Sequence, residues 1–258
     1  MNVFFLGAAL CLSSCGTLVI PQSRIAGNGH VREEVRNLSG FQQVHAARSL
    51  QVEITQKEAY EVRIEADENL LPYIVTEVSG DQLKITVMDN YQFYNYNKAV
   101  VYVSAPRFTR LGVTTSANMH LRGPLNAGSL QLKAGTSSRL LSDAEIRAEE
   151  VQIDISTSAR AELLVVSPSV SIQTSTSSRL ALKGRTDRMN LRMNTSSRVD
   201  AENFPAREAE VSGNTSSRAV LQVSDLIKGS LNTSSRIDYR GNPVLDVRCN
   251  TSGRIAPF

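Results

Sequence analysis

The chain has 258 residues, a formal net charge of +3 and three cysteines. This length allows one large domain, and so small a charge gives no reason to expect a nucleic-acid partner. The cysteines are too few and too unevenly placed for a disulfide framework.

The first residues are typical of an export signal. An apolar run from Val3 to Leu12 is too short to span a membrane, and Leu12-Ser13-Ser14-Cys15 resembles a bacterial lipobox. On this interpretation residues 1–14 are a signal peptide, and Cys15 becomes a lipidated N-terminus that anchors the protein to a membrane. No Lys or Arg precedes Cys15, so an ordinary secretory signal or a short buried helix is the alternative. We expect a lipid-anchored protein of the bacterial cell envelope, at the outer membrane.

A short tether at residues 15–26 leads into a region rich in strand patterns. Strands are expected at 30–37, 50–55, 60–65, 71–78, 82–88 and 98–104, with turn formers such as Ser79-Gly80-Asp81 between them. The stretch 44–52 weakly resembles 113–121, which indicates irregular coils of the repeat described below. We therefore place residues 27–258 in one domain.

One segment of this region mixes aromatic and amide side chains. Residues 90–98 contain Tyr91, Phe93, Tyr94 and Tyr96, interleaved with Asn and Gln. Aromatic faces and amide groups together suit contact with a glycan. The alternative is a loop whose rings cap the domain or pack on a neighbouring strand.

A Thr-Ser pair then recurs at a regular spacing to the end of the chain. The eight threonines are Thr115, Thr136, Thr157, Thr176, Thr195, Thr215, Thr233 and Thr251, separated by 18–21 residues. The residues four and six positions before and after each threonine are mostly apolar, and the residues that flank the fourth position before it are mostly polar. This period-2 alternation is typical of strands with one buried face.

Two such strands in each period of about 20 residues predict an all-β fold, a parallel β-solenoid with about eight regular coils over 109–258. We expect a right-handed β-helix that follows a less regular β-rich N-terminal part. An antiparallel sandwich or barrel would also contain many short strands. That alternative does not explain why the same residue types return at one place in every coil.

The Thr and Ser hydroxyls of the repeat are expected to be structural, bonding to local backbone or to their copies in adjacent coils. The arginine that follows them is different, because a solenoid would place all its copies in one stripe, which we call the Arg column. The Arg column contains Arg139, Arg160, Arg179, Arg198, Arg218, Arg236 and Arg254.

The Arg column is the strongest candidate for a binding surface. Guanidinium groups can grip the phosphate or carboxylate groups of a polyanion, such as an anionic polysaccharide or lipopolysaccharide. The alternative is a solvated edge with no ligand. Glu162, Asp200 and Asp238 lie two residues beyond alternate arginines and are expected to offset part of the repulsion.

Several stretches resemble one family. They include Gly27-Asn28-Gly29, Leu38-Ser39-Gly40-Phe41 and the segment from Tyr60 to Leu71, together with the Ser-rich repeats. The chain resembles the putative auto-transporter adhesin, head GIN domain family, over roughly residues 27–258. The resemblance implies a β-solenoid, an exported protein that is often lipid-anchored, and no established enzymatic activity.

No catalytic, metal-binding or cofactor motif stands out. The histidines His30, His45 and His120 are far apart in sequence, and no paired-Cys pattern exists. We therefore expect no enzyme, no metal and no cofactor, but a binding or adhesion-type surface module. The alternatives are a β-helix polysaccharide-processing enzyme, a lyase or a hydrolase, and a purely structural envelope protein. The sequence also indicates self-association into a homo-oligomer.

Overall fold

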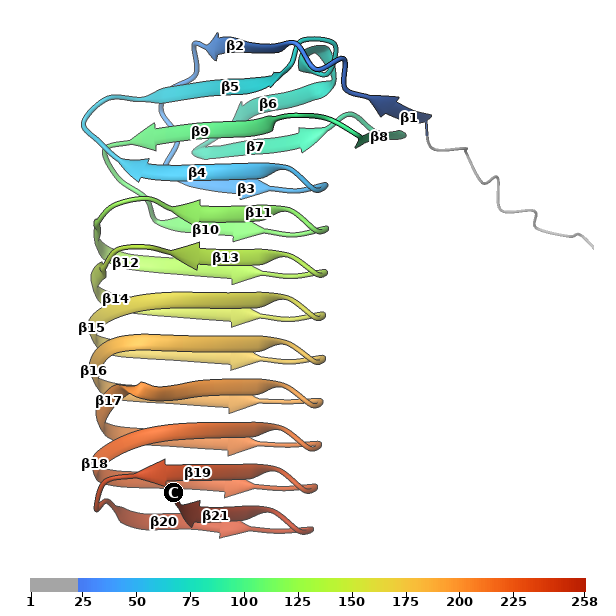
Figure 1. Cartoon of the computed structure of the whole chain (residues 1–258). Helices are drawn as coiled ribbons and strands as arrows, with labels where there is room; N and C mark the ends of the chain where they lie inside the picture. Colours follow the sequence, from blue (N-terminus) through green and yellow to red (C-terminus); the bar gives the residue numbers. More distant parts are fainter. Residues whose placement is uncertain (1–22) are drawn as a thin grey trace, which may run out of the picture.

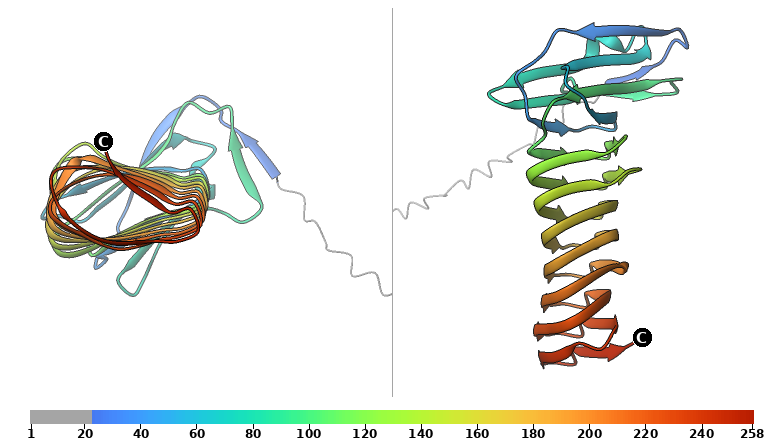
Figure 2. Two further views of the ribbon diagram at one scale, coloured as in Figure 1. Left: turned by 90° about the horizontal axis from the view of Figure 1, so that it is seen from below. Right: turned by 90° about the vertical axis from the view of Figure 1, so that its left-hand side faces the viewer.

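The computed structural model describes residues 23–258. The proposed signal peptide and the lipidation site Cys15 lie outside these residues. Within the described part, every regular element is a strand, apart from one short 3-10 helix, η1 (Leu71–Tyr73). Figure 1 shows a stack of flattened coils with a broader N-terminal head at one end, and Figure 2 shows the coils superposed in a single oval outline.

The regular part is the parallel β-solenoid that the repeat predicts. Its chain winds as a right-handed coil, because in Figure 1 the front strands run leftward and the back strands rightward as the chain descends. The strands are β10 (Arg110–Val113), β11 (Asn118–Leu121), β12 (Leu125–Ala134), β13 (Arg139–Ser142), β14 (Ile146–Ile155), β15 (Arg160–Thr174), β16 (Arg179–Met193), β17 (Arg198–Gly213), β18 (Arg218–Leu231), β19 (Arg236–Arg240), β20 (Val244–Cys249) and β21 (Arg254–Pro257). All their mutual pairings are parallel, which excludes the antiparallel sandwich.

The interior is a continuous column of apolar side chains, in the places that the alternation predicts. The residue four positions before each of the first five threonines is fully buried, and its copies pair in register from coil to coil. These residues are Leu111, Leu132, Ile153, Ile172 and Leu191. Each coil covers the apolar face of the next, so the repeats stabilise one another rather than folding singly.

Each Thr-Ser pair forms a sharp corner between the two sheets. Both residues have positive φ, near 50° and 60°, as in a type I′ turn. The N–H of the residue after the pair bonds back across the turn, for example from Ala117 to the Thr114 carbonyl at 3.1 Å. The corners also bond to one another, since the Ser116 N–H donates to the Thr136 carbonyl at 2.9 Å and the pattern continues coil by coil. We call the exposed Thr-Ser pairs the corner column.

The N-terminal head extends both sheets beyond the regular coils. The front sheet continues through β4 (Gln51–Gln56), β9 (Ala99–Ala105), β5 (Glu61–Asp67) and β2 (Val31–Arg36). The back sheet continues through β3 (Gln43–Ala46), β7 (Gln82–Val87) and β6 (Ile74–Ser79). A separate parallel pair joins β1 (Ser23–Ala26) to β8 (Tyr91–Tyr94).

The structure of the head differs from the sequence-based prediction at two segments and confirms the irregular coil at residues 44–52. Residues 23–26, placed in the tether, form β1, and residues 71–73, placed in a strand, form η1. The resemblance between 44–52 and 113–121 does mark an irregular coil, but its register differs by two residues. Val44 pairs with Leu111 and not with Val113, and Val52 pairs with Met119.

Candidate functional site

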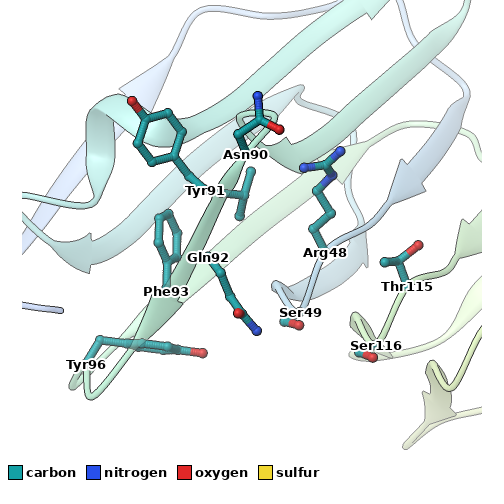
Figure 3. Close-up of a pocket in the computed structure, with 10 residues that line it drawn as sticks. Arg48, Ser49, Asn90, Tyr91, Gln92, Phe93, Tyr96, Thr115 and Ser116 are labelled. Carbon is teal, nitrogen blue, oxygen red and sulfur yellow. The ribbon is translucent and has the colours of Figure 1, made fainter. Parts of the chain in front are cut away.

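A cleft of about 600 Å³ opens where β8 overhangs the upper end of the corner column. Figure 3 shows three rings on one side, corner residues on the other and the Gln92 amide between them. We call it the aromatic cleft. Its lining residues are Arg48, Ser49, Val87, Asn90, Tyr91, Gln92, Phe93, Tyr96, Thr115 and Ser116.

The aromatic wall is held by packing against the head. Tyr91 and Phe93 are half-buried against the hydrophobic core, and the Tyr91 ring lies 4.6 Å from that of Tyr73. Tyr96 meets Phe93 edge to face at 6.3 Å and remains 38% exposed. The wall therefore combines two fixed rings with one ring that is open to a ligand, and fixed rings contact a ligand at little entropic cost.

Asp67, which is fully buried at the end of β5, holds the far end of the aromatic segment. Its carboxylate accepts hydrogen bonds from the backbone N–H groups of Gly29, Asn97 and Lys98 at 2.9–3.2 Å. Burial raises the pKa of Asp67, but these backbone donors together with the nearby His30 outweigh burial and set the pKa below its ordinary value.

Gly27 completes this support because it has no side chain. A Cβ at this position would lie 2.1 Å from Asp67 Oδ2 and 2.6 Å from Tyr96 Cβ. Close packing beneath the last ring of the cleft thus explains the first glycine of the Gly27-Asn28-Gly29 motif.

The opposite wall is formed by the first corner of the corner column, Thr115-Ser116, and by the turn before it, Arg48-Ser49. Arg48 and Ser49 have φ of 62° and 58° and occupy the turn positions that Thr115 and Ser116 occupy in the next coil. The Ser49 N–H donates to the Thr115 carbonyl at 3.0 Å, as in the later corners. Arg48 forms an ion pair with the exposed Asp89 at 2.5 Å, so its guanidinium is held at the mouth of the cleft.

The structure brings together three of the four aromatic residues that the sequence singled out. Tyr91, Phe93 and Tyr96 line the cleft, whereas Tyr94 does not. The side chain of Arg24 stacks on the Tyr94 ring at 4.7 Å. The alternative was that rings of this segment cap the domain or pack on a neighbouring strand, and Tyr91 instead packs on Tyr73 of η1.

The polar wall of the cleft was not predicted from the sequence. Arg48-Ser49 lacks the Thr-Ser signature, so nothing in the repeat identified it as a corner. The only signal was the weak resemblance of 44–52 to 113–121, and it gave the wrong register.

The hydroxyls of the repeat divide into two groups, which corrects the expectation that all are structural. The second serine of the motif points inward and can bond to backbone, as Ser138 Oγ does to the Val113 carbonyl at 3.0 Å. The threonine and the first serine of the motif are exposed. Within residues 23–258 their hydroxyls donate no hydrogen bond to the chain and accept none.

The Arg column forms the predicted stripe beside these corners. Its seven members are exposed and pair in register from Arg139 to Arg254. Of these seven arginines, only Arg236 has a carboxylate partner among the described residues, Asp238 at 2.8 Å, and this contact raises the pKa of Arg236. Glu162 and Asp200 make no such pair, so the expected compensation occurs at one coil of three.

No cluster of three or more potential metal ligands occurs within residues 23–258. Over the same residues, the structure contains no helix of the length and apolarity that crossing a membrane would need.

Comparisons with known proteins identify the architecture. A family model described as "putative auto-transporter adhesin, head GIN domain" matches residues 40–243. A "putative adhesin" from Parabacteroides merdae superposes with a TM-score of 0.84 at 15% identity, covering 91% of this chain and 99% of that one.

Two structures from Parabacteroides distasonis are also similar. A "putative lipid binding protein" gives a TM-score of 0.82 at 21% identity, and a "putative adhesin" gives 0.84 at 16% identity. Each comparison covers 92% of this chain and 100% of the other. At these identities the likeness is one of fold. No curated protein matches the sequence.

Proposed function

We propose that this chain, which belongs to the putative auto-transporter adhesin, head GIN domain family, is a non-enzymatic module that binds an anionic glycan in the aromatic cleft. The family points to an adhesion-type protein of the cell envelope or surface. The glycan and the cleft are our inference from the geometry.

The cleft itself is the observation that supports this function. Tyr96 offers an exposed ring on which the apolar face of a sugar can stack, and the Phe93 ring packs against it edge to face. Gln92, Ser49 and Ser116 line the same cleft with amide and hydroxyl groups that donate and accept hydrogen bonds. A concave shape that combines apolar faces with a few convergent polar groups is typical of a ligand site.

The charge at the cleft favours an acidic ligand. Arg48 has the highly exposed Asp89 as its partner, and a ligand carboxylate or phosphate can replace or share that contact. The Arg column supplies further positive charge below the cleft. The anionic carbohydrate of lipopolysaccharide meets these requirements, and a related fold described as a lipid binding protein is compatible with such a ligand.

We further propose that the protein is held in the envelope by acyl chains on Cys15. A signal ending in Leu-Ser-Ser-Cys supports this proposal, and an outer-membrane location follows from it as part of the proposal. Loss of membrane association in Cys15→Ala, with the protein still exported, is the expected result in a cell fractionation experiment.

A binding and degradation assay tests the function. We expect the full-length protein to bind immobilised polygalacturonate or purified lipopolysaccharide without releasing new reducing ends. We also expect Arg48→Gln to weaken binding. Release of reducing ends would favour the alternative, a polysaccharide-processing enzyme. Absence of binding to every acidic glycan tested would favour a purely structural envelope protein.

A further inference from the structure

We infer that the ligand is an extended acidic polymer that leaves the aromatic cleft and runs along the corner column, with about one sugar for each coil. This inference rests on the proposed function and extends it from a cleft to a track along the long axis of the solenoid.

The cleft and the corner column are one continuous surface. Thr115-Ser116 is the first corner of the corner column and Arg48-Ser49 is the equivalent turn of the preceding coil, and both pairs line the cleft. The next corner follows directly, because the Ser116 N–H bonds to the Thr136 carbonyl at 2.9 Å. Figure 1 shows β8 overhanging the same edge of the molecule on which all later corners lie. A polymeric ligand seated in the cleft can therefore continue along this edge of the protein.

The track repeats at a spacing that suits a polymer. Adjacent strands of a sheet lie about 4.8 Å apart, which is close to the length of one sugar ring in an extended chain. Every coil from Thr136 onward presents the same groups at this interval, two exposed hydroxyls at the corner and one exposed guanidinium beside them. A linear polymer of acidic sugars presents a matching series of hydroxyls and carboxylates.

Apart from Arg236, the guanidinium groups of the Arg column have no carboxylate partner within the described part of the chain. Arg139, Arg160, Arg179, Arg198 and Arg218 form no ion pair with any described residue, although like charges on adjacent strands repel one another. Arg63 in the head behaves differently, since Glu33, Glu61 and Glu65 surround it. The Arg column therefore keeps guanidinium groups that an acidic ligand can contact.

The hydroxyls of the corner column are open in the same way. These hydroxyls are exposed and make no hydrogen bond within residues 23–258. Over the same residues, Arg236 is the one member of the Arg column that forms an ion pair, with Asp238. The most open stretch of the track therefore runs from the cleft to Arg218. When one ligand polymer makes several weak contacts, each contact raises the effective concentration for the next. The affinity should therefore rise with the length of the polymer.

A length series tests this inference. Oligogalacturonates of two to ten sugars are titrated into the full-length protein at fixed salt, and into two triple variants. The track variant carries Arg179→Gln, Arg198→Gln and Arg218→Gln. The control variant carries Arg188→Gln, Arg192→Gln and Arg248→Gln, which remove the same charge from exposed arginines on the strands that precede the corners.

We expect wild-type affinity to rise at least tenfold between the trimer and the octamer. The track variant should lose that rise and bind the dimer and trimer within twofold of wild type, while the control variant keeps the rise. Affinity that does not depend on length beyond the trimer, or an unchanged rise in the track variant, would overturn the track and leave the cleft intact. Failure of the wild type to bind any oligomer would overturn the cleft and the track together.

Discussion

The buried carboxylate of Asp67 accepts a hydrogen bond from the backbone N–H of Gly29 at 2.9 Å. The same carboxylate accepts a second hydrogen bond from the backbone N–H of Asn97, which directly follows Tyr96 at the edge of the aromatic cleft. One side chain thus joins the opening segment of the domain to the segment that carries the exposed ring. The packing of Gly27 against Tyr96 lies between these two contacts.

Replacement of Asp67 by Asn should loosen the aromatic segment. Asn keeps one acceptor but presents an NH₂ group to backbone donors, and hydrogen bonds to a charged group contribute about 1.5–3 kcal/mol. We expect faster amide hydrogen exchange at Gly29, Asn97 and Lys98, with the regular coils unchanged. Asp89→Asn is the control, because it removes an exposed carboxylate that contacts Arg48 instead. Equal protection in both variants would show that Asp67 does not order the segment.

The same contact should depend on pH. The pKa of Asp67 is lower in the folded protein than in the unfolded chain, so its stabilising effect is fully present above the unfolded value of about 3.9. The effect is lost as the pH falls through the lower, folded value. We expect protection of the Gly29 and Asn97 amides, corrected for intrinsic exchange, to be constant from pH 7 to 5 and to fall in more acidic solution. In Asp67→Asn this acid-dependent loss should be absent, and its persistence would assign the effect to another group.

The inward serines offer a matched pair of substitutions. Ser138 Oγ donates to a backbone carbonyl at 3.0 Å, whereas Ser178 Oγ is buried with no partner among the described residues. Ala occupies this place in two other coils, at Ala117 and Ala159. We expect Ser138→Ala to lower the free energy of unfolding by about 1 kcal/mol and Ser178→Ala to leave it unchanged or raise it. Urea denaturation measures both, and a larger loss in Ser178→Ala would show that the Ser178 hydroxyl stabilises the corner.

The conformation of the corners predicts a conflict between stability and binding. Thr195 has φ of 49° and Ser196 has φ of 60°, a region that a β-branched residue rarely adopts and that Asn-Gly adopts readily in type I′ turns. Thr195→Asn with Ser196→Gly should therefore stabilise the protein by about 1 kcal/mol, at the low end of the strain of such residues. The double variant should also bind long oligogalacturonates more weakly, since it removes two hydroxyls of the track. A loss of stability, measured by urea denaturation, would show that these side chains support the fold.

Much of the architecture was predictable from periodicity. The alternation around each Thr-Ser pair places Leu111 and its copies in the interior, and the structure confirms this in every coil through β17. Stacking in register then fixes the Arg column, because copies of one residue must pair with one another. A repeated local pattern is a strong constraint since each coil must match its neighbours.

The cleft was much less predictable, because it depends on contacts between segments that share no pattern. Residues 90–98 were recognised for their aromatic content, but the pairing of β8 with β1 brings Arg24 to Tyr94, and the packing of Gly27 and Asp67 holds the part of the segment next to Tyr96. Arg48 could not be found at all, since a corner residue without the Thr-Ser signature looks like any other turn residue in sequence. The corner hydroxyls were misjudged because sequence shows a hydroxyl but not the direction in which the turn points it.

Two tyrosines separated by a single residue provide the most direct test of the central claim, that the aromatic cleft binds an acidic glycan. Tyr94 and Tyr96 are similarly exposed and lie in the same segment, but only Tyr96 lines the cleft. Isothermal titration calorimetry of trigalacturonate with Tyr96→Ala, Tyr94→Ala and wild-type protein measures the difference. We predict that Tyr96→Ala binds at least tenfold more weakly, about 1.4 kcal/mol, and that Tyr94→Ala binds like wild type. Equal affinity of all three proteins, or a loss confined to Tyr94→Ala, would contradict the claim.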